Sequence, residues 1–206
     1  ASDIEVLELS GEKDLPLLRR LHAAMGRVFG EEELDAVETL EAELAGTHPR
    51  CKAVVVVVLG PPPADGGERP VLGGAVWEYF IRAESFLYTY LFIDPEVPRD
   101  KGLGRLIANK QWSYVRRLET EGLRNRGIFV EMHDPDLVED PTADAMDPRK
   151  RVQMMSHLGT RQVGKPRFSF HQPPLDWEEG QPLADAEHAP YLLGHVLTKR
   201  TARDEA

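Results

Sequence analysis

The alternation of apolar and polar positions divides the chain into strand-like and helix-like segments. Apolar and polar residues alternate over residues 4–9, and an almost continuous apolar run fills residues 53–59. These patterns predict a half-buried strand and a fully buried one. Runs rich in β-branched and aromatic residues predict further strands at residues 71–81, 84–93, 128–132 and 191–197.

Helical spacing and capping residues predict four helices. Apolar residues recur every three or four positions from Leu17 to Phe29, with Asp14 as an N-cap and Pro16 in the first turn, so a helix is expected there until Gly30. Similar signals predict helices at residues 31–45, 104–122 and 148–158. Between these elements lie a Pro/Gly-rich loop at residues 60–70, an acidic loop at residues 134–147, and a tail with a segment at 167–171 and a turn at Pro173–Pro174.

Composition limits the classes of function. With 206 residues and 41% hydrophobic residues, the chain is expected to form a single domain over residues 1–206. Its net charge of −10 argues against nucleic acid and anionic membranes as partners, and no apolar run is long enough to span a bilayer. The single cysteine, Cys51, and the absence of a leader-like segment favour the cytoplasm. Cys51 is expected to be a small buried residue.

A glycine-containing turn between a predicted strand and a predicted helix is the main chemical signal. Gly102 and Gly104 open the helix, so its first backbone N–H groups and the positive end of its dipole are available to an anion. Arg99, Lys101 and Arg105 add positive charge around the same turn. The turn lacks the Gly-Lys-Ser/Thr of a nucleotide P-loop and the third glycine of a dinucleotide fingerprint.

The complete string from Ile93 to Ile107, IDPEVPRDKGLGRLI, closely resembles the acyl-CoA-binding motif of the GNAT superfamily of N-acyltransferases. That motif is a hydrophobic strand, a proline turn and Arg/Gln-x-x-Gly-x-Gly/Ala. The resemblance implies an α/β fold of the α+β type, with a mixed, mostly antiparallel twisted sheet and helices on both faces. The element order predicted along the chain agrees with such a fold.

The resemblance also implies a co-substrate, acetyl-CoA, and its contacts. Backbone groups near Phe92 and Ile93 would hold the pantetheine arm between two splayed strands. The pyrophosphate would bind at Arg99, Lys101, Gly102, Leu103, Gly104 and Arg105. The implied reaction is direct attack of a small-molecule amine on the thioester.

Glu131 is the expected catalytic base, because it is a carboxylate late in the apolar strand that follows the helix. Burial there would raise its pKa towards a useful value. A solvent-exposed or arginine-paired Glu131 is the equal alternative, and His133 is a second candidate base.

One position departs from the family pattern. Met155 stands where many GNAT enzymes have a tyrosine that protonates the leaving thiolate, and methionine has no proton to give. Ser156, His157, Tyr88 or water would have to replace it. The alternative function is therefore a non-catalytic acyl-CoA-binding or sensing module. The histidines and Cys51 show no metal-ligand spacing, so no metal is expected. The acceptor amine, the acyl chain and the oligomeric state, a homodimer included, stay open.

Overall fold

A computed structural model describes residues 4–29, 33–98, 102–136, 138, 146–157, 159–163 and 191–196 of the chain. The chain divides into two compact units, Ala1–Arg126 and Gly127–Ala206, and each is described by itself. Within the described residues, no helix is both long and apolar enough to cross a membrane.

The first unit contains an antiparallel sheet. Its strands follow one another in space as they do along the chain: β1 (Glu5–Leu9), β2 (Cys51–Leu59), β3 (Val71–Phe80) and β4 (Ser85–Ile93). The register between β3 and β4 shifts at Val76/Trp77, where the partner changes from Tyr90 to Tyr88. Thr89 is therefore the extra residue of a bulge in β4.

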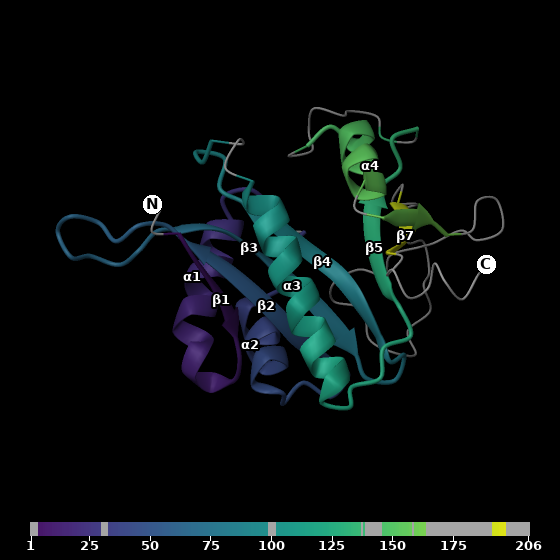
Figure 1. Ribbon diagram of the computed structural model, residues 1–206, viewed down its shortest axis with the longest axis horizontal. Helices are drawn as coiled ribbons and strands as arrows, with labels where there is room; N and C mark the ends of the chain where they lie inside the picture. Colours follow the sequence, from purple (N-terminus) through teal and green to yellow (C-terminus); the bar gives the residue numbers. More distant parts are fainter. Residues whose placement is uncertain are drawn as a thin grey trace. The chain divides into compact units, whose positions relative to one another are not determined.

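Helices cover both faces of this sheet. After a short 3-10 turn, η1 (Glu12–Asp14), come α1 (Leu15–Met25), α2 (Val37–Ala45) and α3 (Leu103–Thr120). A Cβ built on Gly74 would lie 2.8 Å from Leu21 of α1, whereas one on Gly73 would lie 3.5 Å from Ile107 of α3. Because adjacent strand residues face opposite sides, α1 and α3 lie on opposite faces. Figure 1 shows α3 running across the strands.

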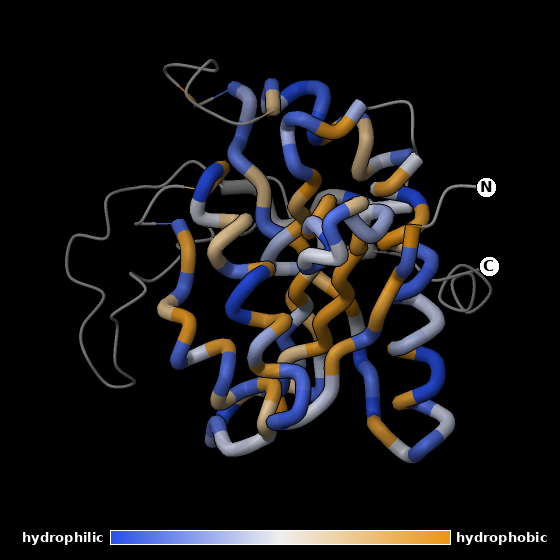
Figure 2. Tube along the Cα trace, turned by 90° about the vertical axis from the view of Figure 1, so that its left-hand side faces the viewer, coloured by the Kyte–Doolittle hydropathy of each residue, from blue (hydrophilic) through white to orange (hydrophobic). Residues whose placement is uncertain are grey.

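The core forms where α1 and α2 pack on the sheet. Its buried members include Leu18 and Leu21 of α1, Leu40 of α2, and Val55 and Val57 of β2. The strands form the most hydrophobic part of the trace in Figure 2. Gly74 is required here because any larger side chain would also meet the Val56 carbonyl oxygen at 2.5 Å. The valine-rich run therefore forms the buried strand that its composition predicts.

Two predicted helix boundaries are wrong. The first helix ends at Met25 with Gly26 as its C-cap, not at Gly30, and the second begins at Val37, not at residue 31. The segment before α2 is held by a tertiary contact, since the backbone N–H of Asp35 donates a hydrogen bond to the Tyr90 hydroxyl at 3.0 Å. Local helix propensity cannot anticipate such a contact.

The second unit is smaller. It contains β5 (Ile128–His133), α4 (Pro148–His157), β6 (Thr160–Gln162) and β7 (Tyr191–Val196), and β7 pairs antiparallel with both β5 and β6. The sequence does not predict the three-residue strand β6, which is too short to leave a periodic pattern. The segment at residues 167–171 and the Pro173–Pro174 turn lie outside the described residues.

Candidate functional site

The turn after β4 has the local structure that its sequence predicts. The N–H of Val97 donates to the Asp94 carbonyl oxygen at 3.0 Å, and the N–H of Glu96 donates to the Asp94 carboxylate at 3.0 Å. This closes a turn around Pro95. Arg27, just after α1, anchors the turn through an ion pair with Asp94 at 2.8 Å. The turn is thus closed by its own hydrogen bonds and tied to the end of α1 by a side-chain ion pair.

The N-terminus of α3 presents backbone donors. Gly102 is the N-cap, with a left-handed φ of 67°, and no side chain among the described residues caps the helix. The first hydrogen bond of the helix runs from the Leu106 N–H to the Gly102 carbonyl oxygen at 3.1 Å. The N–H groups of Leu103, Gly104 and Arg105 precede it and therefore have no acceptor within the helix. Together with the helix dipole they form an anion-binding geometry.

The residues at this helix start differ in exposure. Leu103 is buried and anchors the first turn, whereas Gly102 and Arg105 are exposed. A Cβ on Gly104 would lie 3.5 Å from Ile93 Cδ1, which is ordinary contact, so the last residue of β4 lies directly beside the helix start. Arg99 and Lys101, the other two expected cationic contacts, lie outside the described residues.

The register of β4 assigns different directions to the two expected backbone contacts. The N–H of Asp94 donates to the Leu72 carbonyl oxygen at 3.0 Å. Hydrogen-bonded pairs alternate in an antiparallel ladder, so Phe92 directs its backbone groups towards β3. Ile93 directs its own towards the opposite edge of β4. Of the two residues, Ile93 is therefore the better backbone partner for a ligand at that edge.

A polar cluster on the α1/α2 face of the sheet is absent from the sequence-based expectations. The Tyr90 hydroxyl donates to the Asp35 carboxylate at 2.7 Å, and the Thr89 hydroxyl donates to Glu78 on β3 at 2.5 Å. Glu43 of α2 is 2% exposed. The sequence offers one signal for this polar cluster, which is Glu78 inside the otherwise apolar strand at residues 71–80.

Burial dominates the electrostatics of this cluster. It raises the pKa of Glu43 to about 9 and raises that of Glu78, and repulsion between these neighbouring carboxyl groups adds to the shift of Glu43. Burial also raises the pKa of the Cys51 thiol to about 12 and lowers that of His48. Cys51 is 4% exposed, which confirms the prediction of a small buried residue.

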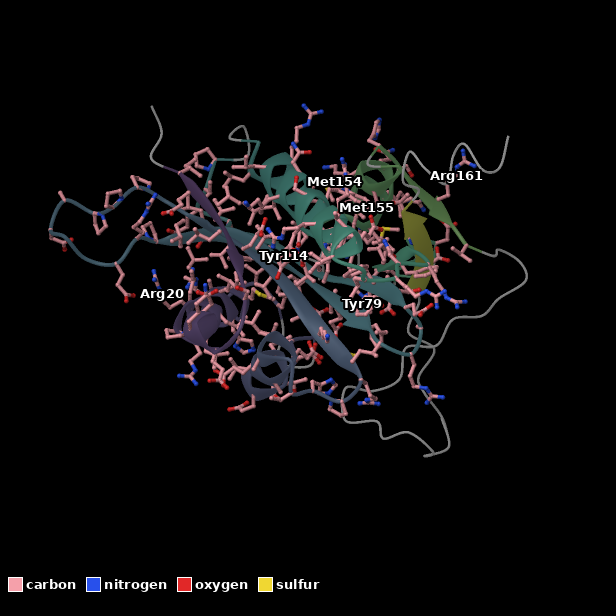
Figure 3. The ribbon with its side chains drawn as sticks, turned by 60° about the horizontal axis from the view of Figure 1, so that its bottom comes forward. Arg20, Tyr79, Tyr114, Met154, Met155 and Arg161 are labelled. Atoms are coloured by element: carbon pink, nitrogen blue, oxygen red, sulfur yellow. The ribbon has the colours of Figure 1, made fainter. Side chains whose placement is uncertain are left out.

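The other candidate residues lie in the second unit, apart from Tyr88. Glu131 and His133 are half-buried on β5, opposite Leu193 and Tyr191 of β7. Met155 is buried on α4, next to Met154 (Figure 3).

Of the groups that could replace the missing tyrosine, Ser156 and His157 are exposed on α4. Tyr88 is buried in the first unit against Trp77, with ring centroids 4.9 Å apart, and burial raises its pKa.

Comparison with known proteins gives matches in structure only. No protein-family model matches the chain, and no curated protein is significantly similar to it in sequence.

Two solved structures share the architecture over nearly the whole chain. A Bacteroides thetaiotaomicron protein assigned to the GNAT family of acetyltransferases aligns with a TM-score of 0.58 at 15% identity, covering 98% of this chain and 92% of that one. Arabidopsis thaliana NAA60 in complex with acetyl-CoA aligns with a TM-score of 0.52 at 12% identity, covering 93% and 97%. At such identities the likeness establishes the fold, and it confirms the fold expected from the sequence.

Proposed function

Because the chain has the GNAT fold, we propose that it is an acyl-CoA-dependent N-acyltransferase that moves an acetyl group from acetyl-CoA to the amine of a small molecule. The observation that carries this proposal is the start of α3. Gly102 adopts a left-handed conformation there, and three consecutive backbone N–H groups precede the first helical hydrogen bond. The phosphates of a coenzyme are a kind of anion that such a helix start binds.

The residues of the proposed coenzyme site have different roles. The amides of Leu103, Gly104 and Arg105 bind the pyrophosphate, and the cationic side chains of Arg99, Lys101 and Arg105 neutralise its charge. The backbone of Ile93, at the edge of β4 away from β3, holds the pantetheine arm.

Acetyl-CoA supplies the acyl group as a thioester, and the acceptor must react as a neutral amine. Glu131 takes the proton from the amine. The leaving thiolate takes its proton from Ser156, His157, Tyr88 or water.

A second candidate function is a non-catalytic acyl-CoA-binding or sensing module. Met155 favours it, because a buried thioether at this position cannot protonate a thiolate. The two functions share the coenzyme site and differ only in turnover.

Calorimetric titration of acetyl-CoA into the protein tests the shared site. Gly104→Glu places a carboxylate where the pyrophosphate would bind, and we expect it to weaken binding by about tenfold or more. Asn109→Glu is the matched control, since it adds the same charge at an exposed position of the same helix. Wild-type protein that fails to bind acetyl-CoA, or equal weakening by both variants, would overturn the proposal.

A thiol-release assay with acetyl-CoA and a panel of small amines separates the enzyme from the sensor. The enzyme releases coenzyme A in the presence of at least one amine, and Glu131→Gln lowers kcat without changing acetyl-CoA affinity. Tight acetyl-CoA binding with no release on any amine would instead support the sensing module.

A further inference from the structure

Three potential metal ligands converge where α2 passes into β2. Glu43 lies in the last turn of α2, His48 lies just beyond the helix end, and Cys51 is the first residue of β2. Glu43 Oε1 is 3.8 Å from His48 Nδ1, and one ligand atom of each of the three residues lies within 4.8 Å of the others. Gly46, in a left-handed conformation with φ of 76°, reverses the chain so that these residues meet.

The carboxyl group of Glu43 is only partly satisfied by its surroundings. The residue is 2% exposed, and its Oε2 atom has no hydrogen-bond partner among the described residues. Its Oε1 atom lies 3.8 Å from His48 Nδ1, and its carboxyl group also shares a hydrogen bond with that of Glu78. A buried carboxyl group is costly to ionise unless a cation or a metal pairs with it. Oε2 is therefore a possible ligand atom that no hydrogen bond among the described residues occupies.

We propose that Glu43, His48 and Cys51 bind a Zn²⁺ ion. Sulfur, imidazole nitrogen and carboxylate oxygen are the donors that Zn²⁺ takes in tetrahedral sites, whereas Mg²⁺ and Ca²⁺ require oxygen ligands only. Two donors on one Zn²⁺ lie about 3.4 Å apart. The 3.8 Å contact between Glu43 and His48 approaches this spacing, and the three ligand atoms, all within 4.8 Å of one another, would draw closer when the metal binds.

Zn²⁺ binding replaces one existing hydrogen bond of His48 with a bond to the metal. His48 Nδ1 accepts the backbone N–H of Cys51 at 3.1 Å, and Zn²⁺ takes the place of that donor.

The fourth ligand of the Zn²⁺ ion is Glu78 or a water molecule. Glu78 pairs in register with Ala53, so it lies on the same face of the sheet as Cys51, and its carboxyl group lies close to that of Glu43. The metal thereby joins the end of α2 to the first residues of β2. This proposal does not depend on the proposed acyltransferase function, since the site uses none of its residues.

Zn²⁺ titration of the full-length, chelator-treated protein tests the proposal. We expect one high-affinity Zn²⁺ per chain, and a loss of affinity of about tenfold or more in each of Cys51→Ser and His48→Ala. Glu38→Gln, at an exposed position of α2, is the matched control and should bind as the wild type does. Circular dichroism of each variant confirms that it is folded before titration.

Cobalt substitution provides a second readout that a purely structural effect would not produce. Co²⁺ bound to the wild type should give a thiolate-to-cobalt charge-transfer band, and Cys51→Ser should abolish this band. No high-affinity Zn²⁺ site in the folded wild type would overturn the proposal. Equal Zn²⁺ affinity in all variants, or a Co²⁺ spectrum without the thiolate band, would overturn it as well.

Discussion

The hydroxyl group of Tyr90 on β4 donates a 2.7 Å hydrogen bond to the carboxylate of Asp35, a residue 55 positions earlier in the chain. The same hydroxyl accepts the backbone N–H of Asp35 at 3.0 Å, and its ring packs against Phe29 with centroids 5.6 Å apart. One buried side chain therefore holds the segment that joins α1 to α2 against the strand leading to the helix start of α3.

Tyr90→Phe should destabilise the protein while keeping the ring contact with Phe29. Removing the hydroxyl leaves the carboxylate and the N–H of Asp35 without this partner, and we expect a loss of about 1–3 kcal/mol in the free energy of unfolding. Urea denaturation followed by circular dichroism measures it. Tyr79→Phe, which removes a single 2.8 Å bond to the Arg124 carbonyl oxygen, should cost less. A larger loss for Tyr79→Phe would contradict the role assigned to Tyr90.

Gly102→Ala should weaken acetyl-CoA binding by about tenfold, because a left-handed φ costs a residue with a Cβ about 1 kcal/mol and the helix start relaxes away from the anion-binding geometry. Gly122→Ala is the matched control. Gly122 has a φ of 102° just beyond the other end of α3, and a Cβ there meets nothing within 4 Å, as at Gly102. Calorimetry should find unchanged affinity in Gly122→Ala. Equal losses in both variants would mean that helix stability, rather than the turn, governs binding.

The sequence predicts the proline turn and the glycine start of α3 because both are determined locally. Glycine at position 102 permits the left-handed N-cap, and Pro95 after Asp94 specifies the preceding turn. The valine-rich strand is equally local in origin, since β-branched apolar residues favour a buried strand wherever they occur together. These features need no knowledge of the rest of the fold.

The polar cluster could not be predicted in the same way. Glu43, His48 and Cys51 show no known metal-ligand spacing, and they meet only because Gly46 ends α2 and β2 starts five residues later. Glu78 joins them through strand pairing with Ala53. Similarly, the late start of α2 depends on Tyr90, far away in sequence. Contacts between distant segments therefore account for most of the differences between expectation and structure.

Gln111→Glu should be strongly destabilising at neutral pH. The side chain of Gln111 is fully buried on α3, and its Nε2 donates to the Val54 carbonyl oxygen at 3.0 Å and to that of Ala75 at 3.2 Å. A carboxylate would face two carbonyl oxygens with no proton to donate, so we expect a loss of about 2–4 kcal/mol. Urea denaturation should also find a smaller loss at acidic pH, where the protonated glutamate regains one donor. Asn109→Glu, two residues earlier and exposed, should be nearly neutral. A loss that does not change with pH would argue against the role of the amide donors.

The hairpin between β3 and β4 should contribute less to stability in acid than at neutral pH. Glu84, at its turn, accepts hydrogen bonds from Arg126 at 2.7 Å and from Arg124 at 3.1 Å, and the bond from Arg126 is the main reason that the pKa of Glu84 is lowered. A carboxyl group whose pKa is lower in the folded state stabilises that state above its unfolded pKa. This stabilisation is lost as the pH falls through the folded pKa.

Glu84→Gln isolates this effect, because glutamine adopts the same φ of 50° at the same backbone cost. We expect the variant to be less stable than the wild type at neutral pH. The difference should shrink as the pH falls below the ordinary range of a glutamate, and also as salt is added, since both arginines are largely exposed. Urea denaturation of the two proteins across this pH range measures the difference, with Glu38→Gln as a control that should follow the wild type throughout. A difference that stayed constant with pH would assign the effect to packing of the side chain rather than to its charge.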